Sequence, residues 1–498
     1  MCIRDRSKSA SGALLSTVEI DRNLKVPLYK QLENFLRGLI LDGILKPKQK
    51  LPSSRELAED LSISRITVKS VYEQLIAEGY LKSKTGSGTF VSEDLEFFSY
   101  KKLKSVMVKP ADVEGKLPDR VDPINLSQAT IRYGKTAPFR PGLPALDKFP
   151  IKSWNKYLFN AMSESDRYNL GYGSLNGSRD LRRSIAQHLA DARGLRVDAE
   201  QIVITSGAQQ AFVLISFALL KAGDTVWYEN PGHIAGRDVM TAMGANVMPV
   251  PIDAEGLDLD YAKNNFDIPK LIFATPSHQH PLGITMSLAR RLSLLKFAGN
   301  NNSWIIEDDY DSEFRYRGRP LPALSALDEE RRVFYVGTFS KALCSAVRLG
   351  YVVVPEWLIE TFAKATNLLG QNASPITEAA LAQFINDGRF AEHIRKMRRL
   401  YRDRRDTLIE CLNENCSDLL SFTSSDAGMH IIADIESGID DQTAYKALLG
   451  KGIESLPLSV YCLKPIERTA LVLGFSGVPR KRMPKLVKKM SETLRSIH

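Results

Sequence analysis

The chain contains no run of about 18 or more apolar residues, the length that a membrane-spanning helix needs. The charged residues Arg4, Asp5 and Arg6 stand where a signal peptide would begin its long apolar stretch. We therefore predict a cytoplasmic protein that has neither a membrane segment nor a secretion signal.

Cysteine is also scarce, with five residues in 498. An odd number of cysteines without paired spacing does not indicate a disulfide framework, and no spacing matches that of a zinc site. We expect reduced thiols, as in the cytoplasm, and no metal. The five positions are Cys2, Cys344, Cys411, Cys416 and Cys462.

The length and charge of the chain indicate more than one domain. At 498 residues, 44% of them hydrophobic, the sequence can form several large cores. The net charge of +9 is uneven, because residues 1–116 hold 20 Lys and Arg against 15 Asp and Glu. This density is typical of a nucleic-acid-binding arm, although a solvated charged face would have the same composition.

Three helices are predicted in the first part of the chain. Apolar residues repeat at helical spacing over residues 28–41. Ser53 and Glu56 have the spacing of a capping box that starts a second helix, and Ser64 caps a third. Two short helices joined by a tight turn, with polar and basic residues at the start of the second, suit a DNA major groove.

A basic hairpin follows the helices. Residues 80–84 and 88–91 are predicted strands joined at Thr85-Gly86-Ser87. Such a hairpin suits contact with a neighbouring groove or with phosphates. A small helical protein-interaction domain is the alternative.

The motifs LPSSRELA at 51–58, SRITV at 64–68 and GSGTFV at 86–91 resemble those of the GntR-type winged helix-turn-helix. The resemblance covers residues 26–93 and implies that the partner is double-stranded operator DNA. Gly86 would stand at the tip of the wing. The DNA contacts that the resemblance implies are Arg55, Ser64, Arg65, Thr67, Lys69 and Gly86.

A polar, lysine-rich stretch separates this region from the rest. Residues 94–124 contain prolines and several lysines, and we predict a linker there. Residues 1–25 are predicted to be an unstructured extension. From residue 125 to 498, helical and strand patterns alternate, which implies a parallel sheet flanked by helices.

The segment 338–348 carries the main chemical prediction. Apolar runs at 333–336 and 349–354 flank it and are typical of buried strands. A lysine in this setting is costly unless it is paired or used chemically, and desolvation frees its amine to attack a carbonyl. We predict that Lys341 is the catalytic residue and forms a Schiff base with pyridoxal phosphate. A lysine that snorkels at a strand end is the alternative.

Two places are predicted to hold the cofactor phosphate. Ser340 offers a hydroxyl beside the lysine, and Arg348 offers a forked cation seven residues further on. The strand 202–205 leads into a small-residue turn that opens a helix, where free backbone N–H groups bind anions. The residues of this turn are Ser206, Gly207, Ala208 and Gln209.

The cofactor ring is predicted to meet residues that follow other strands. His233 offers a flat side chain for stacking. Asp308 is our choice for the carboxylate that keeps the pyridine nitrogen protonated, with Asp309 and Asp311 as alternatives. Tyr310 should reach the ring hydroxyl.

These pieces, in this order, resemble the fold-type I aminotransferases over residues 125–498. The fold class is thus an α+β winged helix-turn-helix domain joined by a linker to an α/β fold-type I pyridoxal phosphate-dependent aminotransferase-like domain. The segment LGYG at 170–173 resembles the usual N-terminal stretch of that family. The resemblance implies a homodimer in which Tyr172 reaches the neighbouring subunit's site.

Two positions depart from the aminotransferase pattern. His280 precedes Pro-Leu-Gly where aminotransferases carry Asn, so His278 is a candidate for the ring-hydroxyl contact. Val472 occupies the place of the arginine that binds the substrate α-carboxylate. Losing that bidentate clamp weakens carboxylate binding or transfers it to another residue, for which Arg237 and Arg468 are candidates.

The fusion of a GntR-type reader with an aminotransferase-like domain resembles the MocR subfamily of bacterial transcription regulators. This resemblance implies that the second domain senses an amine or amino acid by aldimine exchange at Lys341 and so changes how the dimer grips DNA. Two alternatives stay open. One is an active aminotransferase with an accessory DNA-binding module, and the other is a regulator that no longer holds pyridoxal phosphate.

Overall fold

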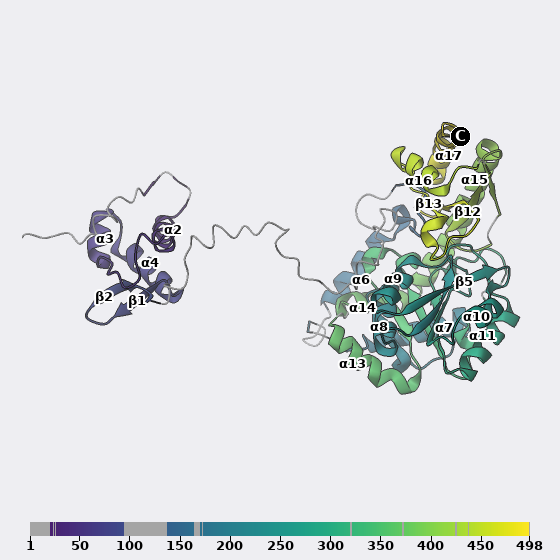
Figure 1. Ribbon diagram of the computed structural model, residues 1–498, viewed down its shortest axis with the longest axis horizontal. Coiled ribbons are helices and arrows are strands. Elements are labelled where there is room, and N and C mark those ends of the chain that lie inside the picture. Colours follow the sequence, from purple (N-terminus) through teal and green to yellow (C-terminus); the bar gives the residue numbers. More distant parts are fainter. Residues whose placement is uncertain are drawn as a thin grey trace, which may run out of the picture. The chain divides into compact units, whose positions relative to one another are not determined.

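The computed structural model describes residues 20–22, 24, 26–93, 137–163, 170–171, 173–318, 321–370, 373–423, 426–436 and 438–497. The chain divides into two compact units, residues 1–117 and 118–498 (Figure 1). The predicted linker 94–124 and most of the predicted extension 1–25 lie outside the described residues. Among the residues described, no helix combines the length and apolar character needed to cross a membrane.

The N-terminal unit contains the three predicted helices. Ser53 and Glu56 form a complete capping box at α3, and the Ser64 hydroxyl accepts a hydrogen bond at the start of α4. These caps satisfy backbone N–H groups that a helix start leaves unpaired, so the short α3 is well defined. Leu32, Leu57 and Val71 contribute one core residue from each helix. The bounds are α2 (Leu28–Leu41), α3 (Ser54–Asp60) and α4 (Arg65–Ala77).

The predicted hairpin is present as β1 (Leu81–Lys84) and β2 (Gly88–Val91). The strands pair antiparallel from Leu81 opposite Val91 to Lys84 opposite Gly88. Gly86 has a φ of 75°, a conformation that glycine adopts without steric cost. The hairpin therefore turns at the residue predicted for the wing tip.

An eight-stranded sheet organises the C-terminal unit, in the order β3-β10-β9-β8-β7-β4-β5-β6. The pairs that join β4, β5, β7, β8 and β9 are parallel, as predicted, whereas β10 runs antiparallel to both β9 and β3. The predicted parallel sheet is thus confirmed for its centre but not for β10, because the short connection from β9 to β10 returns the chain without a crossover helix. The bounds are β3 (Ile202–Thr205), β4 (Thr225–Asn230), β5 (Asn246–Asp253), β6 (Gly256–Leu257), β7 (Leu271–Ala274), β8 (Trp304–Asp309), β9 (Val333–Thr338) and β10 (Gly350–Val353).

Helices cover both faces of this sheet, which explains why its central strands are buried along their length. Tyr228 and Phe273 pack in one apolar cluster with α8, α9 and α13, and their neighbours Trp227 and Ile272 pack in another with α10 and α11. Helices α7 and α14 contribute to a third cluster. The bounds are α7 (Arg179–Arg193), α8 (Ala208–Leu219), α9 (Ile234–Ala242), α10 (Leu259–Asn265), α11 (Leu288–Asn300), α13 (Ile359–Leu369) and α14 (Pro375–Asn386).

A smaller sheet of four strands, ordered β11-β12-β14-β13, follows in the sequence. Figure 1 shows α16 and α17 grouped with this sheet and apart from α10 and α11. Side chains of this smaller sheet belong to the same apolar cluster as those of α7 and α14, and the long helix α15 and the helix α6 contribute to it too. The bounds are α6 (Ile151–Ser163), α15 (Arg389–Cys416), β11 (Leu420–Phe422), β12 (His430–Ile435), α16 (Asp441–Gly450), β13 (Leu456–Pro457), β14 (Ala470–Gly474) and α17 (Met483–Arg495).

One buried carboxyl group holds a loop against the large sheet. Glu307 on β8 is fully buried and accepts backbone hydrogen bonds from Leu324 and Ser325, each 2.8 Å long. Burial raises the pKa of Glu307 to about 7, from an ordinary value of 4.5, and the negative charge of Asp309 adds to the rise. Between these pH values the folded protein binds the proton more tightly than the unfolded chain does.

The free energy of unfolding should therefore fall as the pH rises from about 4.5 to 7. Glu307→Gln removes this contribution, so we expect the variant to gain about 3 kcal/mol relative to wild type across that window. Urea unfolding at pH 5 and pH 8 measures the difference. Glu360→Gln, an exposed position on α13, is the control; an equal pH dependence in all three proteins would contradict the prediction.

Candidate functional site

The predicted site residues follow strands whose carboxyl ends meet at one edge of the large sheet. Asp309 at the end of β8 pairs with Gly337 near the end of β9, and Ala274 at the end of β7 pairs with Glu307. Ligands of α/β sheets bind at this edge. The segments that follow β4, β7, β8 and β9 thus bring His233, His278, Asp308 and Lys341 to one region.

Lys341 lies on the short helix α12 (Phe339–Ala342), one turn beyond β9. Its Nζ atom donates a hydrogen bond of 2.8 Å to the carbonyl oxygen of Gly142. A Cβ atom at Gly142 would lie 2.5 Å from Nζ, and Gly142 has a φ of 69°, so this position requires glycine. The sequence reasoning missed Gly142, which is 199 residues away and carries no side-chain signal.

The three aspartates proposed for the ring nitrogen, Asp308, Asp309 and Asp311, differ in their partners. Asp309 forms an ion pair of 2.8 Å with Arg193 and accepts a hydrogen bond from Tyr335. Asp311 Oδ2 lies 3.1 Å from Nδ1 of His278. These contacts favour neither Asp309 nor Asp311 as the free carboxylate of the site.

Asp308 has an open acceptor atom. Within the described part of the chain, its buried Oδ1 has no hydrogen-bond partner, and its Oδ2 lies 3.8 Å from Nδ1 of His233. Burial raises the pKa of Asp308 well above its ordinary value, and the charges of Asp309 and Glu229 add to the rise. The positive charge of Lys341 opposes this rise. A buried acceptor of this kind fits a protonated ring nitrogen.

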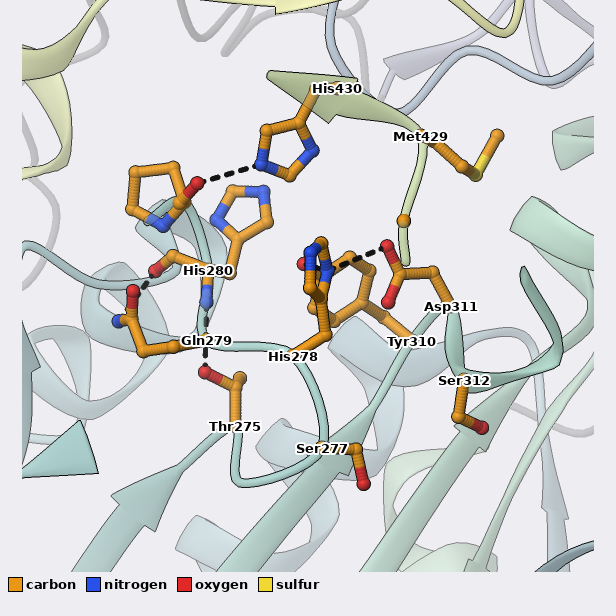
Figure 2. A network of polar contacts seen from close by, with 12 residues as sticks. Thr275, Ser277, His278, Gln279, His280, Tyr310, Asp311, Ser312, Met429 and His430 are labelled. Carbon is orange, nitrogen blue, oxygen red and sulfur yellow. Dashed lines mark hydrogen bonds and ion pairs between the residues drawn. The ribbon is translucent and has the colours of Figure 1, made fainter. Parts of the chain in front are cut away.

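Tyr310 and His278 contact each other in the polar network of Figure 2. The Tyr310 hydroxyl lies 2.9 Å from His278 Nδ1, the same atom that contacts Asp311. Both residues predicted for the ring hydroxyl are therefore part of one network. Gly428 packs on the imidazole, since a Cβ there would lie 2.1 Å from Cε1 of His278.

Two further histidines, His280 and His430, lie beside this network (Figure 2). Their ring centroids are 5.5 Å apart, and His430 Nε2 lies 2.7 Å from the carbonyl oxygen of Pro281. Burial lowers the pKa of His430 to about 4, and it lowers that of His280 well below its ordinary value. Both rings are therefore uncharged at neutral pH. Sequence analysis missed His430 because nothing local to β12 marks it as a site residue.

His233 is the N-cap residue of α9 and the start of that helix places its ring. The ring is nearly parallel to that of Phe273, with an interplanar angle of 12° and centroids 6.4 Å apart. It meets His280 edge-on at 5.4 Å. His233 is thus a rigid flat group beside Asp308, as the stacking prediction requires.

The predicted phosphate residues come together through strand pairing. Gly350 of β10 pairs with both Thr205 at the end of β3 and Thr338 at the end of β9. Gly207 is the N-cap of α8, and a Cβ at Gly350 would lie 2.8 Å from its Cα atom. The N-terminus of α8, where backbone N–H groups attract anions, is therefore adjacent to the loop that carries Lys341.

The other phosphate candidates belong to the same corner. The Thr338 hydroxyl accepts a hydrogen bond of 3.2 Å from the backbone N–H of Ser340 and so fixes the start of α12. Arg348 is exposed and has a φ of 53°, in the left-handed region. The predicted phosphate-binding turn runs from the end of β3 into the first turn of α8, through Ser206, Gly207, Ala208 and Gln209.

The two arginines predicted to bind the effector carboxylate already form ion pairs within the protein. Arg468 forms a two-pronged ion pair with Asp434, with distances of 2.5 and 2.8 Å. Arg237 pairs with Asp238 at 3.2 Å and donates to the Val460 carbonyl oxygen at 3.3 Å. Val472 is fully buried in an apolar cluster of β12, β13 and β14. Tyr172 lies outside the described residues.

The predicted DNA contacts lie on the surface of the N-terminal unit. Arg65 and Lys69 are exposed on α4, and Arg55 is exposed on α3. Lys69 forms an ion pair of 3.6 Å with Glu73, and Arg55 forms one of 3.3 Å with Glu59. All four side chains are largely exposed to solvent. Surface pairs of this kind are weak and leave the cations available for phosphates. The remaining predicted contacts are Ser64 and Gly86, both exposed, and Thr67, which is partly buried.

Comparison with known proteins identifies both units. Residues 28–91 match the family of bacterial regulatory proteins of the gntR type, and residues 124–489 match aminotransferase class I and II. The probable rhizopine catabolism regulatory protein MocR of Rhizobium meliloti is 36% identical over 473 residues, which cover 93% of each chain. The pyridoxine biosynthesis transcriptional regulator PdxR of Corynebacterium glutamicum is 32% identical over 90% of this chain and 91% of its own.

Solved structures are similar to the C-terminal unit. The kynurenine aminotransferase of Pyrococcus horikoshii, solved in complex with PMP, has a TM-score of 0.68 and 26% identity. It covers 79% of this chain and 98% of its own length. An archaeal alanine:glyoxylate aminotransferase has a TM-score of 0.70 and 25% identity over 77% of this chain and 98% of its own.

The packing of Gly428 on His278 generates a prediction. In Gly428→Ala, the new Cβ atom would lie only 2.1 Å from Cε1 of His278, so the imidazole must move away from Tyr310. The φ of 88° at this position adds backbone strain. We expect a loss of about 2 kcal/mol or more in unfolding free energy. Gly450→Ala on α16, where a Cβ meets nothing within 4 Å, is the control. Equal thermal unfolding of the two variants would contradict the close packing at His278.

Proposed function

The chain belongs to the MocR-type transcriptional regulators, in which a GntR-family DNA-binding domain precedes an aminotransferase class I and II domain, and we propose that pyridoxal phosphate bound at Lys341 makes it a sensor of amines or amino acids. The observation that carries the proposal is a buried carboxylate with an open acceptor atom, Asp308, at the same edge of the sheet as a lysine amine that the Gly142 carbonyl oxygen orients. Solved relatives of the same fold, one of them in complex with PMP, support the choice of cofactor.

Each residue has a distinct proposed role. The Gly142 carbonyl oxygen orients the Lys341 amine by accepting its hydrogen bond. Asp308 Oδ1 would accept a hydrogen bond from the protonated pyridine nitrogen, and burial, which raises the pKa of this carboxyl, makes its charge costly without such a partner. Tyr310 and His278 would face the ring hydroxyl through the network they share with Asp311.

Other residues would fix the position of the cofactor. The N-terminus of α8, together with Ser340 and Arg348, would bind the phosphate. The ring of His233 would stack on the pyridine ring. When bound, pyridoxal phosphate supplies an aldehyde that condenses reversibly with amines. The protein's contribution is to orient Lys341 and keep a proton at the ring nitrogen.

Sensing is a better account than turnover. Val472 stands where aminotransferases carry the α-carboxylate arginine, and it is buried among apolar residues. Arg468 is held by Asp434, and Arg237 by Asp238, so neither replaces that clamp without breaking an ion pair. An active aminotransferase is the second candidate, favoured by the retention of Lys341. Sustained transfer of amino groups to a keto acid would support it.

We propose a homodimer as the working form. Large apolar side chains are exposed on the C-terminal unit, among them Phe159 on α6 and Leu368 on α13, each 72% accessible in the single chain. Large exposed apolar side chains mark an association surface where they gather into a patch. A dimer would present two winged helices to operator DNA, and that partner makes the cytoplasm the proposed place of action.

Removing the amine separates sensing from DNA binding. Lys341→Ala should lose visible absorbance from the cofactor and lose any effect of added amines on DNA affinity, because no nitrogen remains to anchor the aldehyde. Its DNA affinity without amines should stay within about twofold of wild type, since α4 and the wing are in the other unit. Absorbance spectra and fluorescence anisotropy measure the two properties. Lys364→Ala, an exposed lysine on α13, should retain both, and an amine response that survives in Lys341→Ala would refute the proposed role.

Removing a DNA contact should have the opposite pattern. Arg65→Ala should weaken binding to the specific operator by about tenfold, the cost of one base-edge contact, and leave the cofactor spectrum unchanged. Mobility-shift titrations at fixed salt test this. Arg389→Ala removes one exposed arginine from the C-terminal unit and serves as the control for net charge. Unchanged affinity in Arg65→Ala would exclude this arginine as an operator contact.

A further inference from the structure

An isoleucine on the DNA-binding helix is exposed without a packing reason. The side chain of Ile66 on α4 is 80% accessible, the highest value for any large apolar residue in the described chain. The core of the N-terminal unit is otherwise well formed from Leu32, Leu57 and Val71. Ile66 therefore contributes little to the stability of the free protein.

Helical geometry places Ile66 opposite the buried face of α4. Val68 and Tyr72 lie on the buried face with Val71 and Leu75, and at about 100° per residue that face is centred about 180° from Ile66. Lys69 lies one turn further along the same outward ridge as Ile66. The apolar side chain thus stands at the N-terminal end of the outward ridge, the part of a recognition helix that faces base edges.

The surroundings of Ile66 fit DNA better than an apolar protein surface. Arg65 precedes it, Lys69 follows on the same ridge, and both are exposed. Two cations beside the isoleucine favour a polyanion and disfavour an apolar partner, which would have to desolvate them. In the major groove, the apolar group on base edges is the 5-methyl group of thymine.

We propose that Ile66 packs on the 5-methyl group of a thymine in the operator and so selects thymine at that position. This inference rests on the proposed operator binding and specifies one base contact within it. It differs from the contacts of Arg65 and Lys69, because a methyl group is recognised by shape and burial and not by charge. The preference should therefore depend little on salt, unlike the phosphate contacts.

Replacing single thymines tests the proposal. The full-length protein first selects its site from a randomised duplex library, and each fixed thymine is then replaced by deoxyuridine, which removes only the 5-methyl group. For wild type we expect at least one replacement to raise Kd by about fourfold, the value of one buried methyl group. In Ile66→Ala the same replacement should change Kd by less than about 1.5-fold, and Ile66→Val should be intermediate. Ile44→Ala, another exposed isoleucine of this unit, should respond as wild type does.

Three outcomes would overturn the inference. These are a selected site with no fixed thymine, deoxyuridine replacements that leave the wild-type Kd unchanged, and a methyl effect that persists in Ile66→Ala. In each case specific DNA binding itself would stand. Failure of the full-length protein to select any sequence would instead refute the proposed function together with this contact.

Discussion

The candidate site depends on one buried carboxylate that the protein does not satisfy by itself. Asp308 stands near the end of β8, just before Asp309, which forms an ion pair with Arg193, and Asp311, which contacts His278. An ionised carboxylate with an open, buried acceptor is costly, and folded proteins seldom keep such a group unless something binds it. The surrounding sheet is the element that forces Asp308 into this position, because Asp308 pairs with Val336 inside a layer covered by helices on both faces.

The remaining features of the site are consistent with that constraint. Burial lowers the pKa of His280 and of His430, so these two histidines add little positive charge to the site at neutral pH. The charge of Lys341 lowers the pKa of the carboxyl, and the Lys341 amine donates a hydrogen bond to the Gly142 carbonyl oxygen. A ligand that brings both a ring N–H and an aldehyde would complete the two groups at once, which is why pyridoxal phosphate suits the site better than a simple cation.

Much of the fold could be predicted from local signals. The capping box of Ser53 and Glu56 and the hairpin around Gly86 depend on neighbouring residues, and the structure has both. The sequence did not indicate that β10 runs antiparallel to its neighbours, because apolar character identifies a buried strand but not its orientation. Lys341 lies on a short helix, although the apolar runs around it suggested strand ends.

Site residues were harder to predict where the partner is distant in sequence. Gly142 contacts Lys341 across 199 residues, and His430 comes from a different sheet. The choice of Asp308 over Asp309 and Asp311 was open in the sequence, because it depends on where Arg193 and His278 lie. The carboxylate clamp is the opposite case, since the expectation of its loss comes from the sequence alone, where Val472 occupies the place that the aminotransferase resemblance gives to an arginine.

The central claim is that the amine at position 341 carries the cofactor in a protein that binds specific DNA. Borohydride reduction of the purified full-length protein, followed by mass spectrometry of its peptides, tests this most directly. The account predicts a phosphopyridoxyl mass increase on the peptide that contains Lys341 and on no other lysine-containing peptide. An unmodified Lys341 peptide, obtained after the protein has been supplied with pyridoxal phosphate, would contradict it.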